Sequence, residues 1–381
     1  MAKEFNATHP KLKVIVTQTQ IADDVTKLAT AIRAGDPPDL IGLDLVNMPV
    51  FTANGSFLDL TPYVSQLPYK DALSKGHLNI AAYQGKNYGV PYLADLSVLW
   101  YNKDLFKRAG LDPSTPPANY ADILADAKKI SAFGNGIYGF SFAGNCPGCL
   151  GFTQVPNMAA ANQNIINGTI PNQTANVASN QALSQTLQLY RQIYAQHLNP
   201  PSDRTENGST WGKLFTAGKV GIFPASYGIS LGSGAGLDPK LAAKIADTPI
   251  PGPNGGYATF DGGDDFAIPA KAKNASGAWE FVKFVLDQQQ QVQYPKLGFT
   301  PVRTDVLTPQ FKQQNPFDAV ALQALTHGYV PTTLAYNQAF NAASAPYFSM
   351  FSKAVYDGDL QGALKEGQDG ITSALQQSGS A

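Results

Sequence analysis

The segment LKVIVTQTQIADDVTKLATAIRAGDPPDLIGLDL, residues 12–45, changes from the pattern of a strand to that of a helix and back. Apolar residues alternate over 12–17, which predicts a strand, and then recur at helical spacing from Ile21 to Ile32. Gly35 and the Pro37–Pro38 pair end the predicted helix, and the apolar run 40–45 predicts a second strand. This order is a βαβ unit, which predicts a parallel sheet.

Similar alternation continues along the chain. We predict strands at residues 93–101, 137–142, 220–223 and 266–268. We predict helices at residues 120–130, 178–197, 278–286, 337–355 and 360–375. Helices that alternate with strands over 381 residues predict an α/β protein with helices on both faces of its sheets. This length fits two doubly wound domains better than one.

The composition argues against several classes of partner. Only 14% of the residues are charged and the net charge is −1, whereas about 25% are charged in an average soluble domain. No basic stripe is available to neutralise phosphates, so we expect neither nucleic acid nor an anionic membrane surface as a partner. No apolar run approaches the ~20 residues of a membrane span, and Met1 is followed by polar residues rather than by a signal peptide pattern.

The only two cysteines, Cys146 and Cys149, lie in the sequence NCPGC. A thioredoxin-type motif would open a helix, but the glycines that follow predict no helix there. A zinc site would need two more ligands, and the four histidines show no ligand spacing. We therefore predict a local disulfide and no metal site; a free thiol pair and a redox or metal function remain as alternatives.

Three motifs typical of enzymes lack the required context. Residues 134–139 match GxGxxG, but a predicted helix precedes them and a strand follows, the reverse of a dinucleotide site. Ser230 lies in a GxSxG pattern, yet the glycines after it disfavour the helix that a nucleophile elbow needs. Asp264 and Asp265 are neighbours on a strand, so they point to opposite faces and cannot flank one glycosidic bond. We predict no catalytic residues and no cofactor.

Further motifs occur along the chain in a characteristic order. The most specific is YGVPY (88–92) followed by LWYNKDLF (99–106). The others are FNATHP (5–10), AGDPPDL (34–40), GSFLDL (55–60), FTAGKVG (215–221), GGDDFAIP (262–269) and AWEF (278–281). In content and order these motifs resemble the extracellular solute-binding proteins of carbohydrate importers.

The resemblance implies a type II periplasmic-binding-protein fold, in which two doubly wound lobes are joined by a hinge that the chain crosses several times. We place the crossings near residues 93–95, 261–264 and 301–306. The N-terminal lobe then comprises 1–94 with 265–303, and the C-terminal lobe 95–264 with 304–381. The family binds a mono- or oligosaccharide between the lobes, by hinge closure and without chemical change. It hands the ligand to the membrane permease subunits of an ABC importer, so we expect an extracytoplasmic or surface-anchored monomer.

The resemblance and the sequence together predict the ligand-binding residues. Trp211 and Tyr227 lie in polar or Gly/Ser-rich stretches, so each is a candidate aromatic platform, with core packing as the alternative. Position by position, the resemblance assigns ligand contacts to Asp44, Asp95, Asp264, Arg303 and Phe348. The set is completed by Asn47, Tyr92 and Gly263, the last because Gly262 and Gly263 leave room for a ligand beside the backbone.

Two points stay open on the sequence alone. Family members begin with a strand before the FNATHP helix, so the resemblance implies that this first strand is missing from the chain. The same clamp could also hold a non-sugar solute such as a phosphodiester or a polyamine. A serine hydrolase at Ser230 is a more distant alternative.

Overall fold

The computed structural model describes residues 1–19, 21–228 and 237–381. Its centre is a mixed sheet in the order β1-β11-β4-β8-β5. Two long strands, β4 (Val90–Asn102) and β11 (Tyr257–Ala267), dominate this sheet and pair antiparallel with each other. The outer strands are β1 (Ile41–Asp44) beside β11, β8 (Val220–Ser226) beside β4, and β5 (Tyr138–Phe140) beside β8.

Short strands extend the long ones. β9 (Ile245–Thr248) pairs with β4, while β10 (Ile250–Pro251) and β12 (Gly328–Tyr329) pair with β11. Among the described pairs of this sheet only β5–β8 and β11–β12 are parallel. The βαβ argument therefore predicted the α/β class correctly but not the pairing, because β1 lies antiparallel to a strand that comes more than 200 residues later.

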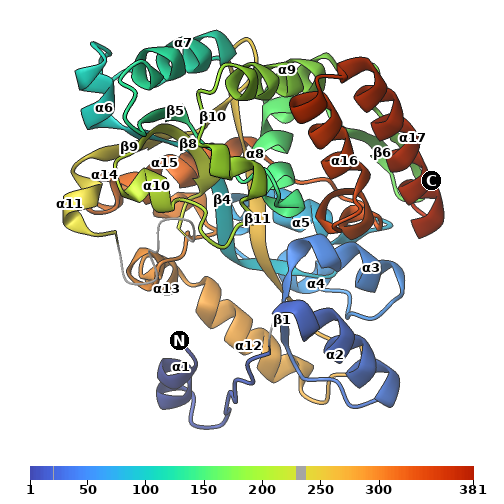
Figure 1. The fold of residues 1–381 in the computed structure, drawn as a ribbon. Helices are drawn as coiled ribbons and strands as arrows, with labels where there is room; N and C mark the ends of the chain where they lie inside the picture. Colours follow the sequence, from blue (N-terminus) through green and yellow to red (C-terminus); the bar gives the residue numbers. More distant parts are fainter. Residues whose placement is uncertain (20, 229–236) are drawn as a thin grey trace.

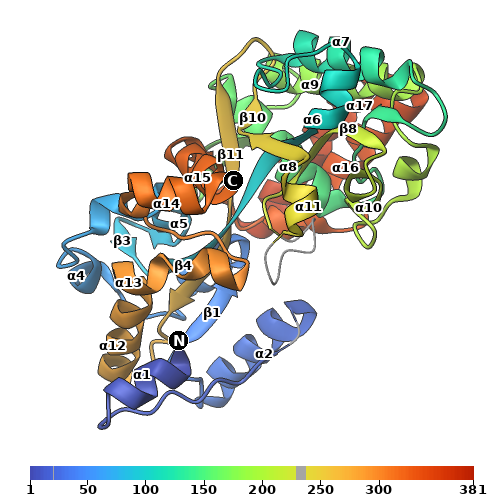
Figure 2. The ribbon, with the colours of Figure 1, turned by 90° about the vertical axis from the view of Figure 1, so that its left-hand side faces the viewer.

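The long strands run between two groups of helices (Figures 1 and 2). One group lies around β1 and comprises α1 (Ala2–Thr8), α2 (Ile21–Ala34), α3 (Met48–Ala53), α4 (Thr61–Val64), α5 (Lys75–Ile80), α12 (Ala275–Leu286) and α13 (Gln288–Gln291). The other lies around β5 and β8 and comprises α6 (Lys103–Arg108), α7 (Tyr120–Ser131), α8 (Pro147–Ala160), α9 (Gln181–Ala195), α10 (Lys213–Thr216), α16 (Pro346–Ser352) and α17 (Leu360–Ser378).

The remaining elements connect or flank these groups. They include α11 (Pro239–Ala242), α14 (Pro309–Gln314), α15 (Pro316–Ala324), the hairpins β2 (Ala82–Tyr83)–β3 (Lys86–Asn87) and β6 (Ile166–Thr169)–β7 (Asn172–Ala175), and several short helical turns, among them η1 (Leu45–Asn47) and η8 (Asn337–Asn341). No described helix is both long and apolar enough to cross a membrane.

The core consists of three buried apolar clusters, two of which extend across both helix groups. Phe140, Tyr190 and Phe351 belong to one buried cluster, and Phe5, Trp100 and Trp279 to another. Phe311 of α14 and Leu322 of α15 pack into the second cluster, with Phe5. The boundaries that we drew at residues 94, 264 and 303 stay a prediction.

Three sequence-based expectations were wrong in their details. Residues 12–17 form no strand: Ile15 and Val16 are 77% and 64% exposed, and no described strand pairs with this segment. The helix predicted over 337–355 is interrupted before Pro346 and divides into η8, α16 and η9 (Lys353–Asp357). A helix does begin directly after Cys146, because Leu150, Val155 and Met158 give α8 a buried face in spite of its glycines.

Candidate functional site

Three carboxylates lie on one face of the sheet where the long strands cross between the helix groups. Asp44 at the end of β1 is the direct register partner of Asp264 on β11. Asp95 on β4 lies opposite Gly262, two residues from Asp264. Because side chains alternate along a strand, this register places Asp44, Asp95 and Asp264 on the same face.

The environment of these acids disfavours their ionised forms. Desolvation raises the pKa of Asp44 to about 7, with added repulsion from Asp264 and Asp95, although its side chain is exposed to solvent. Burial likewise raises the pKa of Asp95 to about 6, against the opposing effect of the Ser226 hydroxyl that donates to it. The pKa of Asp264 is also raised, mainly by burial. Acids held together in this way are acceptors that a ligand with several hydrogen-bond donors would satisfy.

Tyr92 and Gly263 fix this group in place. The Tyr92 hydroxyl donates to Asp264 Oδ2 at 3.2 Å, and the Tyr92 ring stacks on Phe266 with 3.9 Å between ring centroids. Gly263 has φ +121°, and a Cβ there would lie 2.2 Å from the Leu93 carbonyl oxygen. The pairing of β11 with β4 therefore requires a glycine at this position, and the close approach of a ligand stays a prediction.

A pocket of about 450 Å³ adjoins the carboxylates at Asp95. Its wall is completed by the start of α8, the loop at 208–211 and the end of β8, through Gly148, Cys149, Phe152, Gly208, Ser209, Trp211 and Ser226. Trp211 is half-buried, packs edge-on against Phe223, and has an indole N–H without a protein partner. None of the described residues that line this pocket is a lysine or an arginine.

A buried ionic cluster lies on the opposite face of β11. His77 of α5 is fully buried; its Nδ1 lies 2.7 Å from Asp265 Oδ1, and its Nε2 lies 3.3 Å from Asp261 Oδ1. Burial disfavours the imidazolium, but the two carboxylates outweigh it and raise the pKa of His77 to about 10. Asp265 therefore faces away from Asp264, as the alternation along the strand predicted.

Three of the predicted ligand residues contact other protein groups in this structure. Arg303 is 5% exposed, and its guanidinium pairs with Asp305, donates to the Leu286 carbonyl and lies over the Tyr69 ring, so its environment does not support a ligand contact. The Tyr227 hydroxyl donates to Asp318 at 2.6 Å, and its ring stacks on Trp100, so this aromatic packs against the core. Phe348 is half-buried on α16 and packs against the cluster that contains Phe351.

Asn47 occupies a different position from the carboxylates. It ends η1, and its side-chain oxygen accepts a hydrogen bond of 2.8 Å from the Asn337 amide of η8. The two residues are 290 positions apart in the chain. This bond joins η1, near β1, to a helical turn that packs with the other helix group.

The sequence argument missed the part of the site that α8 contributes. Cys149 and Phe152 line the pocket because α8 begins at Pro147, with Cys146 as its N-cap. The glycines and the internal Pro156 concealed this helix, although Leu150, Val155 and Met158 show helical spacing. The structure also forms a disulfide between Cys146 and Cys149.

The enzyme-like motifs gain no support from the fold. The GxGxxG residues form the turn after α7 and the start of β5, so a strand rather than a helix follows the turn, unlike in a dinucleotide site. Asp264 and Asp265 face opposite sides of β11. Ser230 lies outside the described residues. No group of metal-ligating side chains occurs within the parts of the chain that the structure describes.

Comparison with known proteins shows which family the chain resembles over most of its length. Residues 1–319 match the model of the bacterial extracellular solute-binding protein family. The chain is 26% identical over 337 residues to the sn-glycerol-3-phosphate-binding periplasmic protein UgpB of Brucella melitensis, covering 83% of this chain and 74% of that one. It is 24% identical over 338 residues to the diacetylchitobiose binding protein DasA of Streptomyces coelicolor, covering 87% and 75%.

Solved structures agree in fold. The sugar-binding protein MalE of Xanthomonas citri superposes with a TM-score of 0.85 at 19% identity, covering 99% of this chain and 93% of that one. The cyclic alpha-maltosyl-1,6-maltose binding protein of Arthrobacter globiformis gives a TM-score of 0.82 at 21% identity, covering 99% and 94%. The α/β fold is thus that of the periplasmic binding proteins, and these relatives are binding proteins rather than enzymes. The chain belongs to the family of bacterial extracellular solute-binding proteins.

Proposed function

We propose that the protein is the extracytoplasmic receptor of an ABC importer and that it binds a small carbohydrate without altering it. The observation that carries this proposal is the pairing of three acceptor-rich carboxylates, Asp44, Asp95 and Asp264, with an adjoining pocket walled by Trp211 and Phe152. Sugar hydroxyls donate to carboxylates, and the C–H faces of a sugar ring pack on aromatic side chains. No catalytic residue is assigned.

The ligand would bind where the two helix groups face each other across the long strands, and the two groups would close on it as lobes. In this proposal Asp44 and Tyr92 belong to the N-terminal lobe and Trp211 to the C-terminal lobe, with Asp95 and Asp264 at the crossings between them. The closed, loaded monomer would then present the sugar to the membrane permease subunits.

The electrostatics of the site favour a sugar over a phosphate ester. The ionised forms of Asp44, Asp95 and Asp264 would repel an anion, and the one arginine that the sequence placed nearby, Arg303, is paired with Asp305. The glycerol-3-phosphate ligand of the Brucella relative therefore does not transfer readily to this site. A polyamine would suit the carboxylates, but it would leave the aromatic wall without a flat partner.

A thermal-shift screen tests the proposal. The panel contains maltose, diacetylchitobiose and tagatose, with sn-glycerol-3-phosphate and spermidine as the non-sugar arms. A ligand at ~100 times its dissociation constant adds about 2.7 kcal/mol to the free energy of unfolding, which for a chain of this size raises the melting midpoint by a few degrees. We expect a shift with at least one sugar. A shift with glycerol phosphate or spermidine alone would overturn the sugar assignment.

A further inference from the structure

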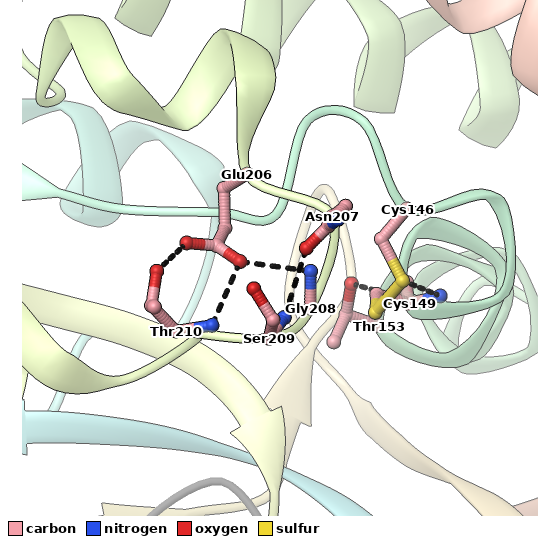
Figure 3. Close-up of a disulfide and its surroundings, with 8 residues drawn as sticks. All are labelled: Cys146, Cys149, Thr153, Glu206, Asn207, Gly208, Ser209 and Thr210. Carbon is pink, nitrogen blue, oxygen red and sulfur yellow. Dashed lines mark hydrogen bonds between the residues drawn. A yellow bond between two sulfur atoms is a disulfide. The ribbon is translucent and has the colours of Figure 1, made fainter.

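The disulfide opens a helix at the edge of the candidate pocket. Cys146 is the N-cap of α8, and its Sγ accepts a hydrogen bond from the Cys149 backbone N–H at 3.3 Å. Both cysteines are half-buried, so small solutes can reach them. Figure 3 shows the two sulfur atoms beside the loop that carries Glu206 to Thr210.

This loop packs directly against the disulfide. Gly208 has φ +97°, and a Cβ at this position would lie 3.3 Å from both sulfur atoms. The side chain of Glu206 holds the turn: its Oε1 accepts from the backbone N–H groups of Gly208 at 2.8 Å and Thr210 at 3.1 Å. The backbone N–H of Asn145 donates to the Glu206 carbonyl at 2.9 Å, which ties the loop to the residue before the first cysteine. The loop then leads to Trp211.

Both sides of this contact face the same pocket. Cys149 lines it from the helix, and Gly208 and Trp211 line it from the loop. Asp95 and Ser226 form the neighbouring wall and are themselves hydrogen-bonded. The disulfide and Gly208 therefore lie next to each other in the wall of the pocket that also contains Trp211.

We propose that the Cys146–Cys149 disulfide is a redox-sensitive wall of the ligand pocket: oxidised, it holds Gly208 and Trp211 in the binding position, and its reduction loosens the loop and lowers ligand affinity. The effect on affinity rests on the function proposed above. The effect on the loop does not depend on that function.

The chemistry is ordinary thiol–disulfide exchange with a dithiol as reductant. A thiolate of the dithiol attacks one cysteine sulfur, the bond between the two cysteines breaks, and a mixed disulfide forms while the other cysteine leaves as a thiolate. The second thiol of the reductant then displaces the first cysteine and closes a cyclic disulfide. The protein gains two electrons and two protons. A Cys146 thiolate would be stabilised at the N-terminus of the 14-residue helix α8.

Reduction changes the contact with Gly208 for a steric reason. Bonded sulfur atoms are roughly 2 Å apart, whereas two separate thiols must move to van der Waals distance. A Cβ at Gly208 would lie 3.3 Å from both sulfurs, so the loop leaves little room on that side of the disulfide. A sulfur that separates from its partner therefore moves toward the loop or into the pocket.

Hydrogen exchange of the sugar-free protein tests whether reduction of the disulfide loosens the loop. We compare the oxidised protein, the dithiothreitol-reduced protein and two variants. Cys146→Ser/Cys149→Ala retains an oxygen that can cap α8 but lacks the bond, whereas Cys146→Ala/Cys149→Ala lacks both. The amides of Gly208 and Thr210 should exchange at least about tenfold faster in the reduced protein and in both variants, with the strand β8 unchanged. Unchanged exchange on reduction, or a change only in the Ala/Ala variant, overturns the proposal.

Calorimetry tests whether reduction weakens ligand binding. It uses the panel sugar that gives the largest thermal shift. We expect at least about tenfold weaker binding after reduction and recovery after reoxidation. Faster exchange with equal affinity would show that the loop responds but is no part of the binding wall, which overturns the proposal. If none of the sugars binds in either state, the function proposed above has failed, and the exchange result alone decides the role of the disulfide.

Discussion

At the scale of single residues, Asp264 is the candidate ligand contact whose position on its strand is best defined. Its carboxylate accepts from Tyr92, faces Asp44 across the β1–β11 pair, and has a raised pKa because burial disfavours its charge. A bulge in the β11–β4 register follows it directly, and Asp265 lies on the buried face. The side chain is thus held rigidly but left with unused acceptor capacity.

We expect Asp264→Ala to weaken sugar binding by roughly 10- to 1000-fold. A carboxylate that accepts sugar hydroxyls forms charge-assisted bonds of about 1.5–3 kcal/mol each, and each 1.4 kcal/mol is about tenfold in affinity. Folding should be retained, because removing a charge that burial disfavours relieves repulsion with Asp44. Calorimetry and a melting curve measure both effects.

The matched control is Asp71→Ala, since Asp71 is an exposed acid outside the site. Asp265→Ala, the control that the sequence alone would choose, is unsuitable. Its carboxylate is fully buried against His77, so its loss would leave a buried cation with one partner fewer and cost about 3–5 kcal/mol. If Asp264→Ala and Asp71→Ala have equal small effects on affinity, the wrong carboxylate has been assigned.

Binding should also depend on pH. In the free protein the pKa values are about 7 for Asp44 and about 6 for Asp95, both raised by desolvation. Sugar hydroxyl donors favour the ionised forms, so each acid must lose its proton when the sugar binds at low pH. Affinity should therefore rise as the pH increases from 5 to 7 and level off above that, by up to tenfold per pH unit for each group. Titrations at several pH values measure this slope.

The variant Asp44→Asn tests whether Asp44 causes the rise in affinity between pH 6 and 7. It removes the group with the higher pKa, so the rise between pH 6 and 7 should become shallower while the lower part remains. An affinity that stays flat, or that falls as the pH increases, would contradict the role of these carboxylates as acceptors.

At the scale of elements, sequence patterns succeeded where burial on one face leaves a clear period. The spacing of Ile123, Ala127 and Ile130 predicted α7, and all three are buried. The same reasoning failed for residues 12–17, because alternation describes a strand only if a partner strand is available. It failed for α8 because Gly148, Gly151 and Pro156 weaken the local helix signal, and tertiary packing compensates.

The site was only partly predictable, because some of its residues depend on tertiary contacts that leave no local sequence pattern. Asp44 and Asp95 lie within strands that the sequence indicated, Asp264 lies just before one, and the register brings the three together. Arg303 could not be judged from its motif, since its partners at Tyr69, Leu286 and Asp305 come from separate elements. Cys149 and Phe152 required a helix that the sequence did not reveal.

The conformation of Gly263 predicts how a substitution there would affect the pairing of β4 with β11. Its φ of +121° is open only to glycine, and a Cβ would overlap the Leu93 carbonyl. Gly263→Ala should therefore disrupt the β4–β11 pairing and destabilise the protein by about 3 kcal/mol or more, combining backbone strain with steric overlap. Gly35→Ala is the control: that glycine has φ +75° and open space around its Cβ position, so only strain of about 1–2 kcal/mol applies. Chemical denaturation that gives equal losses would contradict this account.

At the scale of the whole molecule, the arrangement suits a change between open and closed forms. Two long strands connect the two groups of helices, an arrangement that permits rotation about a hinge. The Asn47–Asn337 bond links η1, near β1, to η8, and Leu45 and Val46 of η1 belong to the same buried cluster as Phe340 of η8. A ligand held by both groups would favour the closed form by its differential affinity for that form.

Small-angle scattering should therefore give a smaller radius of gyration with the saturating panel sugar than without it. We infer that the Asn47–Asn337 bond belongs to the closed form, because it joins residues 290 positions apart, one near β1 and the other in η8. Asn337→Ala would then remove a hydrogen bond of about 0.5–1.5 kcal/mol from that form, so it should weaken apparent affinity by roughly 2- to 10-fold and give a larger radius in the absence of sugar. Asn54→Ala is the control, because the Asn54 amide bonds only to Val50 within its own helix segment. A radius that does not change with bound sugar would exclude hinge closure. An Asn337→Ala variant that matches Asn54→Ala in both measurements would show that the bond between the groups does not bias the equilibrium.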